Sequence, residues 1–137
     1  MLRTVIIDDE AHIRDTLTRL IESNCPQVSL VGEACGVAEG IKAIKNLQPD
    51  LVLLDINMKD GTGFDLLNAF PEKNFKVIFI SAFDKNTIQA FKLSGLEYLT
   101  KPVNPEEISP SISRVVNMEL NYFTLQLLAL EMNMRST

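Results

Sequence analysis

The sequence predicts an α/β fold, a doubly wound parallel sheet of five strands with helices on both faces. Over the first hundred residues, short apolar runs alternate with amphipathic stretches, which is the pattern of a repeated strand–helix unit. Two of the runs, 51–54 and 76–80, are nearly continuous in Val, Ile, Leu and Phe. Strands buried on both faces have this composition. A chain of 137 residues is long enough to form one such domain around a hydrophobic core.

The individual elements follow from periodicity and from stop signals. Apolar residues at helical spacing, such as Ile13, Leu17 and Leu20, indicate the first helix, and Gly95 ends the fourth. The predicted strands are Arg3–Asp8, Ser29–Ala34, Leu51–Leu54, Lys76–Ile80 and Glu97–Leu99. The predicted helices between them are Glu10–Asn24, Ala38–Asn46, Phe64–Ala69 and Lys85–Leu93.

The last third of the chain predicts further helical structure. Asn104 followed by Pro105 is a helix start, with a side-chain cap and Pro at the first position. Pro110 is expected to kink this helix or to restart it, with Ser109 as an alternative cap. Beyond it, an apolar seam at heptad spacing predicts an extended C-terminal helix, formed by Val116, Leu120, Phe123, Leu127, Leu130 and Met134. The seam either packs on its own domain, or mediates self-association, or leads as a signalling helix to an output domain.

Composition and charge exclude several classes of protein. The net charge of −5, with a pI near 4.8, argues against direct nucleic-acid binding, because no basic stripe is present to neutralise phosphates. No stretch approaches 18 consecutive apolar residues, so we expect no membrane span. The chain enters a strand without a charged and apolar leader, which favours a cytoplasmic protein. Cys25 and Cys35 lack CxxC spacing and are expected to be free thiols rather than a disulfide or redox pair.

Polar side chains stand where the predicted strands end. Asp8 and Asp9 follow the first strand, Asp55 the third, Ser81 the fourth and Lys101 the fifth. Ligands of open doubly wound sheets bind outside the carboxyl ends of the strands, so we expect these side chains to meet. A carboxylate at the end of a buried strand is costly unless it is paired, metal-bound or chemically employed.

The carboxylates of Asp8, Asp9 and Asp55 predict a site for a divalent cation. Neighbouring strands lie about 4.8 Å apart, and like charges at that range raise one another's pKa. Mg²⁺ prefers oxygen ligands and keeps positions open for phosphate oxygens, with Mn²⁺ as the alternative. Lys101 adds a positive charge, and the Ser81 hydroxyl can donate to a phosphoryl oxygen. The pattern therefore indicates metal-assisted phosphoryl transfer with Asp55 as the acceptor.

Several short motifs stand in a fixed order over residues 3–117. They are Asp8-Asp9-Glu10, Asp55-Ile56-Asn57-Met58 with Gly61 and Gly63, Ser81-Ala82, and Tyr98-Leu99-Thr100-Lys101-Pro102. In their order and spacing they resemble the receiver domain of two-component response regulators. The resemblance implies a flavodoxin-like sheet of strand order 2-1-3-4-5. It also implies a receiver domain over residues 1–117, with residues 118–137 as a helical extension or a linker to an output domain.

The resemblance implies a role for each residue around the acceptor. Asp55 would take a phosphoryl group from the phosphohistidine of a sensor histidine kinase, or from a phosphotransfer protein. Asp9 and Asp55 would ligate Mg²⁺ together with the backbone carbonyl of Asn57, and Asp8 would help to position the ion. Lys101 would pair with the phosphoryl group. Such a domain is a signalling switch, not an enzyme, that catalyses its own phosphorylation and slow autodephosphorylation.

The resemblance also implies which residues change conformation on phosphorylation and which affect the lifetime of the phosphoaspartate. The resemblance implies that Ser81 is the switch hydroxyl and Tyr98 the switch aromatic, and that a cis peptide precedes Pro102. The family pattern commonly has Pro where this chain has Lys59, which predicts a less rigid loop and a cation near the site. Phe83 would stand at the rim of the site and tune attack by water on the phosphoaspartate.

The run from Asp60 to Leu67, together with Ala82-Phe83-Asp84 and Ala90-Phe91, resembles receivers that precede LytTR-type DNA-binding domains. This implies control of transcription through an output domain, with a stand-alone relay protein as the alternative. Self-association is expected through the C-terminal helix or through the face of the fourth and fifth helices.

Two other functions are disfavoured by spacing. A phosphatase of the haloacid dehalogenase type needs a second acid two residues after its nucleophile, but Asn57 follows Asp55, and Glu10 after Asp8 opens a helix. An FMN-binding electron carrier needs a phosphate loop after the first strand, where Asp8 and Asp9 would repel the phosphate.

Overall fold

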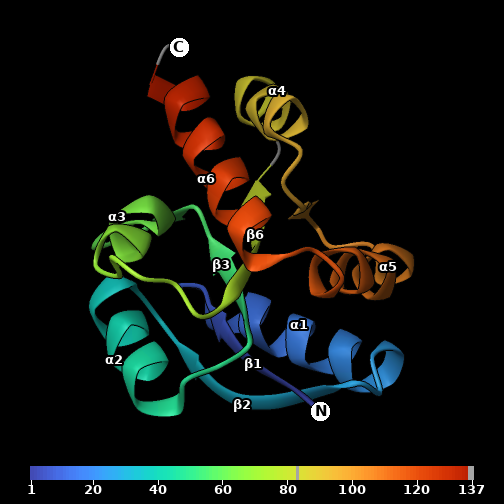
Figure 1. Cartoon of the computed structure of the whole chain (residues 1–137). Helices are drawn as coiled ribbons and strands as arrows, with labels where there is room; N and C mark the ends of the chain where they lie inside the picture. The colour runs from blue at the N-terminus through green and yellow to red at the C-terminus, as the bar shows by residue number, and fades with distance from the viewer. Residues whose placement is uncertain (83, 136–137) are drawn as a thin grey trace.

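The computed structural model describes residues 1–82 and 84–135, without the side chains of residues 121–123 and 133–135. Five parallel strands form one sheet with helices on both faces (Figure 1). Its strands are β1 Leu2–Ile7, β2 Val28–Ala34, β3 Leu51–Asp55, β6 Lys76–Ala82 and β7 Tyr98–Lys101. Their order is β2-β1-β3-β6-β7, which confirms the predicted flavodoxin-like order because β6 and β7 are the fourth and fifth strands of this sheet.

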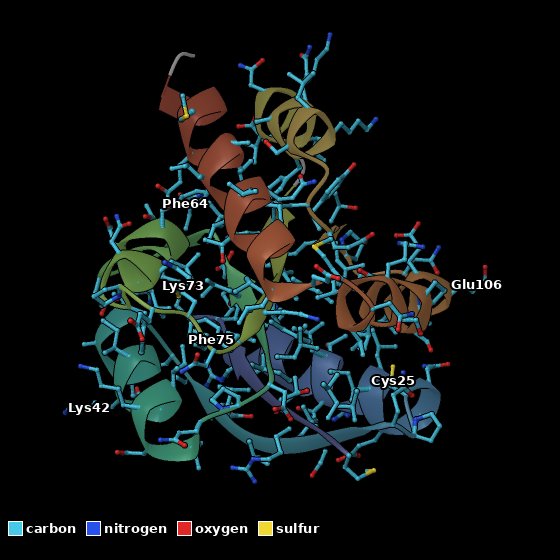
Figure 2. The ribbon with its side chains drawn as sticks, in the orientation of Figure 1. Cys25, Lys42, Phe64, Lys73, Phe75 and Glu106 are labelled. Carbon is cyan, nitrogen blue, oxygen red and sulfur yellow. The ribbon has the colours of Figure 1, made fainter. Side chains whose placement is uncertain are left out.

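The sheet is buried on both sides because its central strands are apolar over most of their length. One face packs against α1 Ala11–Asn24 and α5 Pro105–Val116. The other packs against α2 Val37–Leu47, α3 Gly63–Asn68, α4 Lys85–Ser94 and the C-terminal helix α6 Leu120–Arg135. Figure 2 shows Phe64 and Phe75 on this second side of the sheet. The doubly wound arrangement predicted from the nearly continuous apolar runs is therefore confirmed.

Differences from the predicted elements lie at the carboxyl edge of the sheet. The fifth strand extends to Lys101, because Thr100 and Lys101 pair with Ser81 and Ala82 of β6. A small antiparallel hairpin, β4 Asn57–Met58 and β5 Gly61–Thr62, follows β3 and was not predicted. Two-residue strands carry no periodic signal, so sequence patterns do not reveal them.

Helix α5 starts as predicted but does not restart. The Asn104 side chain accepts a hydrogen bond from the Glu106 N–H, and Pro105 occupies the first turn. The helix continues through Pro110 to Val116, so the predicted restart with Ser109 as its cap is wrong. Pro110 removes a single N–H that would otherwise reach the carbonyl of Glu106 in the first turn, and one such loss is tolerated in a helix that is buried along one face.

Some residues of the predicted heptad seam are buried in the core, and others are exposed. Leu127 and Leu130 of α6 are buried in the same cluster as Phe91 of α4, and α6 lies beside α4 (Figure 1). Val116 and Leu120 are exposed, whereas the side chains of Phe123 and Met134 lie outside the described residues. Of the three readings of the seam, packing on its own domain is therefore the one that the described residues adopt.

The described part of the chain contains no helix that is both long and apolar enough to cross a lipid bilayer. Cys25 is buried and Cys35 exposed, and both are free thiols. Burial raises the pKa of the Cys25 thiol, and the hydrogen bond to Glu39 raises that of Cys35. Both effects disfavour the reactive thiolate.

Candidate functional site at the carboxyl ends of the strands

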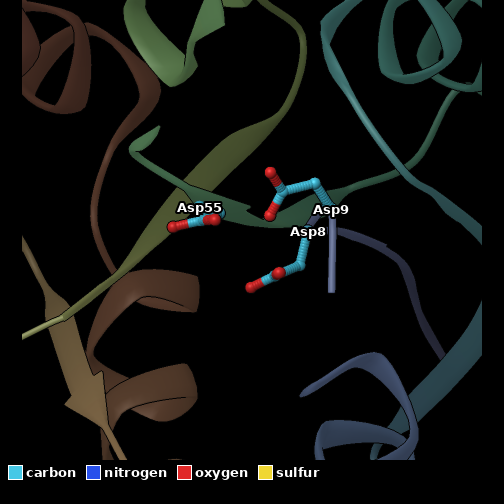
Figure 3. Close-up of side chains that lie close together, drawn as sticks. All are labelled: Asp8, Asp9 and Asp55. Carbon is cyan, nitrogen blue, oxygen red and sulfur yellow. The ribbon is translucent and has the colours of Figure 1, made fainter. Parts of the chain in front are cut away.

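Three carboxyl groups meet at the carboxyl edge of the sheet. Parallel pairing of β1 with β3 aligns Ile7 with Leu54, so Asp8 and Asp55 emerge side by side, with Asp9 following. Figure 3 shows the three side chains gathered at this edge, and one oxygen from each lies within 4.8 Å of the others. Asp8 and Asp55 are buried, whereas Asp9 is half-buried. The predicted convergence of these three carboxylates is confirmed.

Asp8 is held in place by Glu10, the N-cap residue of α1, and by Arg14 within that helix. Its Oδ1 accepts a hydrogen bond from the Glu10 N–H at 2.9 Å, and its backbone carbonyl accepts one from Arg14 at 2.6 Å. Arg14 also pairs with Glu33 on β2. Sequence reasoning missed Arg14, although its position four residues after Glu10 places it on the same face of a helix.

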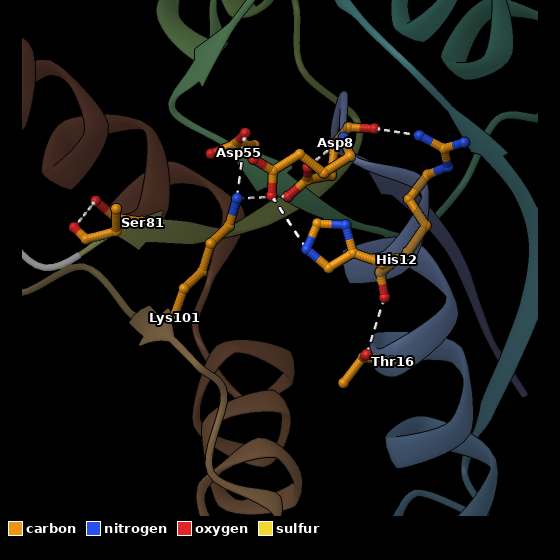
Figure 4. Close-up of polar contacts among 9 residues, drawn as sticks. Asp8, His12, Thr16, Asp55, Ser81 and Lys101 are labelled. Carbon is orange, nitrogen blue, oxygen red and sulfur yellow. Dashed lines mark hydrogen bonds and ion pairs between the residues drawn. The ribbon is translucent and has the colours of Figure 1, made fainter.

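Lys101 lies between the two buried carboxylates. Its Nζ is 2.9 Å from Asp8 Oδ2 and 3.4 Å from Asp55 Oδ2 (Figure 4). Burial alone would lower the pKa of Lys101, but the contact with Asp8 and the charge of Asp55 outweigh it and raise that pKa. The lysine is therefore held as an ammonium group beside Asp55.

Asp55 nevertheless remains electrostatically strained. Burial first, and then the charge of Asp8, raise the pKa of Asp55 to about 6, and Lys101 offsets only part of this effect. A single ammonium shared between two carboxylates, with a third close by, leaves negative charge uncompensated. The site is therefore short of positive charge.

The donor set fits a hard divalent cation. Besides its ion pair with Lys101, Asp8 Oδ2 has no hydrogen-bond partner among the described residues, although it is buried. The Lys101 ammonium that pairs with this oxygen is shared with Asp55, and one positive charge does not neutralise two buried carboxylates. Carboxylate oxygens at this separation are the ligands that Mg²⁺ and Mn²⁺ prefer.

The hairpin after β3 leaves the carbonyl of Asn57 available. The Gly63 N–H donates to the carbonyl of Ile56 at 2.8 Å, so this pair is hydrogen-bonded. Because hydrogen-bonded and non-hydrogen-bonded pairs alternate in an antiparallel ladder, the next pair, Asn57 and Thr62, does not exchange bonds. The Thr62 N–H donates instead to Asp65 at 2.8 Å. The Asn57 carbonyl is thus outside the ladder of this hairpin.

The two residues assigned to the switch occupy distinct positions. Ser81 is buried, and its hydroxyl donates to the carbonyl of Ala82 at 2.9 Å rather than toward Asp55 (Figure 4). Tyr98 is half-buried and stacks on Phe91 of α4 at 5.2 Å between ring centroids. The Lys101–Pro102 peptide is cis, as the resemblance implied.

His12 lies at the rim of the site. Its ring is exposed on α1 and lies 3.7 Å from Glu10 (Figure 4). Phe83, which the resemblance places at the rim of the site, lies outside the described residues.

Compared with the metal-free wild type, the Asp55→Asn variant should gain stability as the pH rises from 4 to 7. The folded state holds the Asp55 proton more tightly than the unfolded chain, because its pKa is raised from 3.8 to about 6. The stability that this proton contributes is complete below pH 4 and is lost as the pH rises through about 6. Relative to Asp55→Asn, the wild type should lose up to about 3 kcal/mol between pH 4 and pH 7. Urea unfolding in EDTA at both pH values measures this, and a pH-independent difference would contradict it.

Comparisons with known proteins agree with the geometry. The family model of the response regulator receiver domain matches residues 4–113. The chain is 40% identical over 116 residues to a response regulatory protein of Vibrio parahaemolyticus, an alignment that covers 84% of this chain and 48% of that protein. It is 34% identical over 116 residues to the sensory transduction protein LytT of Bacillus cereus, covering 83% of this chain and 47% of LytT. The chain thus spans about half the length of these relatives.

Solved structures show the same fold. The REC domain of AraT, a response regulator from Geobacillus stearothermophilus, superposes with a TM-score of 0.71 at 26% sequence identity. That alignment covers 83% of this chain and 92% of the AraT domain.

Proposed function

Because the chain belongs to the response regulator receiver domain family, we propose that it is a phosphorylation-controlled switch in which Asp55 accepts the phosphoryl group. One observation carries the proposal. The Asp55 carboxylate lies at the open edge of the sheet, grouped with Asp8 and Asp9, with the Lys101 ammonium 3.4 Å from its Oδ2. A nucleophile, a cation site and a fixed ammonium are the parts that phosphoryl transfer needs, because its catalysis consists of positioning and charge stabilisation.

The transfer uses Asp55 as an oxygen nucleophile. A carboxylate oxygen of Asp55 forms a bond to phosphorus while the P–N bond of the donor phosphohistidine breaks, and the imidazole nitrogen keeps the electron pair. Asp55 must be ionised to react, and the Lys101 ammonium favours that form. Lys101 is also placed to neutralise an oxygen of the arriving phosphoryl group.

We assign Asp9, Asp55 and the backbone carbonyl of Asn57 as ligands of Mg²⁺ or Mn²⁺, with Asp8 helping to position the ion. When bound, such an ion neutralises charge on the acceptor and on the phosphoryl oxygens. The raised pKa of Asp55, and the single Lys101 ammonium that the buried carboxylates of Asp8 and Asp55 share, support this assignment.

We infer that Ser81 and Tyr98 report the state of Asp55. In the switched state the Ser81 hydroxyl would leave the carbonyl of Ala82 and donate to a phosphoryl oxygen. Tyr98 would follow by moving further inward against Phe91, on which it already stacks. Phe91 belongs to the cluster that buries Leu127 and Leu130, so this movement would reach α6.

The proposed donor is a sensor histidine kinase or a phosphotransfer protein of the cytoplasm. The similarity to LytT supports a receiver that acts with a LytTR-type DNA-binding output domain to control transcription. In that arrangement residues 1–117 form the receiver and residues 118–137 form a helical extension toward the output domain. Self-association through α6 or through the face of α4 and α5 remains a prediction.

Incubation with acetyl phosphate and Mg²⁺ tests the proposal. Intact mass spectrometry should show the addition of one phosphoryl group in the wild type and no addition in Asp55→Asn. EDTA should suppress the labelling, because the acidic cluster then lacks its cation. Equal labelling of the wild type and Asp55→Asn, or no labelling of either, would contradict the proposal.

A further inference from the structure

The loop that carries Asn57 is fastened at both ends. At its base, the Gly63 N–H donates to the carbonyl of Ile56 at 2.8 Å, directly after Asp55. Its two short strands then pair Asn57 with Thr62 and Met58 with Gly61. At its exit, Thr62 and Asp65 form a capping box that starts α3. These bonds fix the strands of the hairpin but leave its tip, Lys59 and Asp60, to be held by something else.

Asp60 binds the tip of the hairpin to the first turn of α2. Its Oδ1 accepts a hydrogen bond from the Val37 N–H at 2.8 Å, and its Oδ2 accepts one from the Ala38 N–H at 3.1 Å. These N–H groups open helix α2, whose own N-cap residue, Gly36, has no side chain to bond them. Asp60 therefore caps α2 from 22 and 23 residues away in sequence. The two N–H groups hold the pKa of Asp60 below its usual range, so it is ionised.

The hairpin tip and the start of α2 also approach each other closely, and each has a glycine at the point of contact. A Cβ at Gly36 would lie 2.7 Å from Asp60 Oδ1, so a larger residue there would displace the carboxylate. A Cβ at Gly61 would lie 3.2 Å from a methyl group of Val37, so the tip also packs directly on the first turn of α2. Hydrogen bonds and packing thus place the tip of the hairpin against the first turn of α2.

We propose that Asp60 is a positioning residue. By anchoring the hairpin, it fixes the position of the Asn57 carbonyl relative to Asp55 and thereby tunes the affinity of the site for Mg²⁺. This inference rests on the proposed function, in which the Asn57 carbonyl is a metal ligand. The carbonyl sits one pair from the base of a hairpin whose tip Asp60 anchors. This chain has Lys59 where the family pattern commonly has a rigid Pro. The hydrogen bonds from Asp60 to the start of α2 therefore restrain the conformation of the loop. Outer contacts that orient a ligand typically change metal affinity by about 10–100-fold when they are removed.

Mg²⁺ titrations of stability separate this role from ordinary capping. The test measures the Mg²⁺ concentration that gives half of the maximal stabilisation against urea, with stability in EDTA determined separately for each variant. Asp60→Ala should raise that concentration about tenfold. Asp60→Asn keeps one acceptor oxygen and should recover part of the loss. Gly36→Ala should act like Asp60→Ala, because it displaces the carboxylate without removing it.

Asp84→Ala is the matched control. Asp84 caps α4 through the N–H groups of Asn86 and Thr87, so its loss also removes one negative charge and one helix cap. Both alanine variants should lose about 1 kcal/mol of stability in EDTA, but only Asp60→Ala should weaken Mg²⁺ binding. Equal half-saturating concentrations in the wild type, Asp60→Ala and Asp84→Ala would overturn the inference and leave the proposed function standing. A wild type that Mg²⁺ fails to stabilise would instead overturn the proposed function.

Discussion

Replacing Lys101 with methionine should lower the free energy of unfolding by roughly 3 to 5 kcal/mol in metal-free buffer at neutral pH. The Lys101 ammonium lies 2.9 Å from Asp8 and 3.4 Å from Asp55, and both carboxylates are buried. Methionine keeps an unbranched side chain of similar size but leaves the two negative charges without a cation. Urea unfolding in EDTA measures the loss.

Two companion variants identify the cause. Adding Asp55→Asn to Lys101→Met removes one of the two stranded charges and should recover part of the lost stability. Lys42→Met, at an exposed position on α2 (Figure 2), should change stability by less than about 0.5 kcal/mol. A loss below about 1 kcal/mol in Lys101→Met would mean that the buried carboxylates do not depend on this lysine.

Replacing Leu130 with alanine should lower the free energy of unfolding by about 2 to 5 kcal/mol. Leu130 of α6 is fully buried in the cluster that contains Phe91 and Leu127, so its loss removes apolar contacts and leaves a cavity. Denaturation of the whole chain, followed by circular dichroism at several protein concentrations, measures the effect. The loss should be independent of concentration, because the leucine is buried within one chain.

Leu128→Ala on the same helix is the control. Leu128 is 54% exposed, so its truncation should change stability by less than about 0.5 kcal/mol. If Leu130→Ala and Leu128→Ala behave alike, α6 does not pack on its own domain in solution. A loss that appears only at high protein concentration would show that the seam is buried between two copies instead.

The strand ends of the site were predictable because they depend on short-range signals. Apolar runs fix where β1 and β3 stop, and parallel pairing then brings Asp8 and Asp55 together. The position of Lys101 followed in the same way from the end of the fifth strand. The strand ends and the order of the strands were therefore enough to predict which residues form the candidate site.

Other features depend on packing between distant segments, which periodicity does not encode. The heptad spacing of Leu127 and Leu130 is the same whether they face a second chain or Phe91 of their own domain. The hydrogen bonds from Asp60 to the start of α2 join segments more than 20 residues apart, and no local sequence signal marks them. Pro110 misled the prediction because its lost hydrogen bond lies in the first turns of α5, where the remaining bonds hold the helix together.

The most direct test of the central claim is to locate the phosphoryl group by chemistry. An acyl phosphate is reduced by borohydride to a primary alcohol, which would convert a phosphorylated aspartate into homoserine. After labelling with acetyl phosphate and Mg²⁺, peptide mapping should find homoserine at position 55 and aspartate at positions 8 and 9. Homoserine at position 8 or 9, or a phosphoryl group on a side chain that borohydride leaves unchanged, would contradict the assignment of Asp55 as the acceptor.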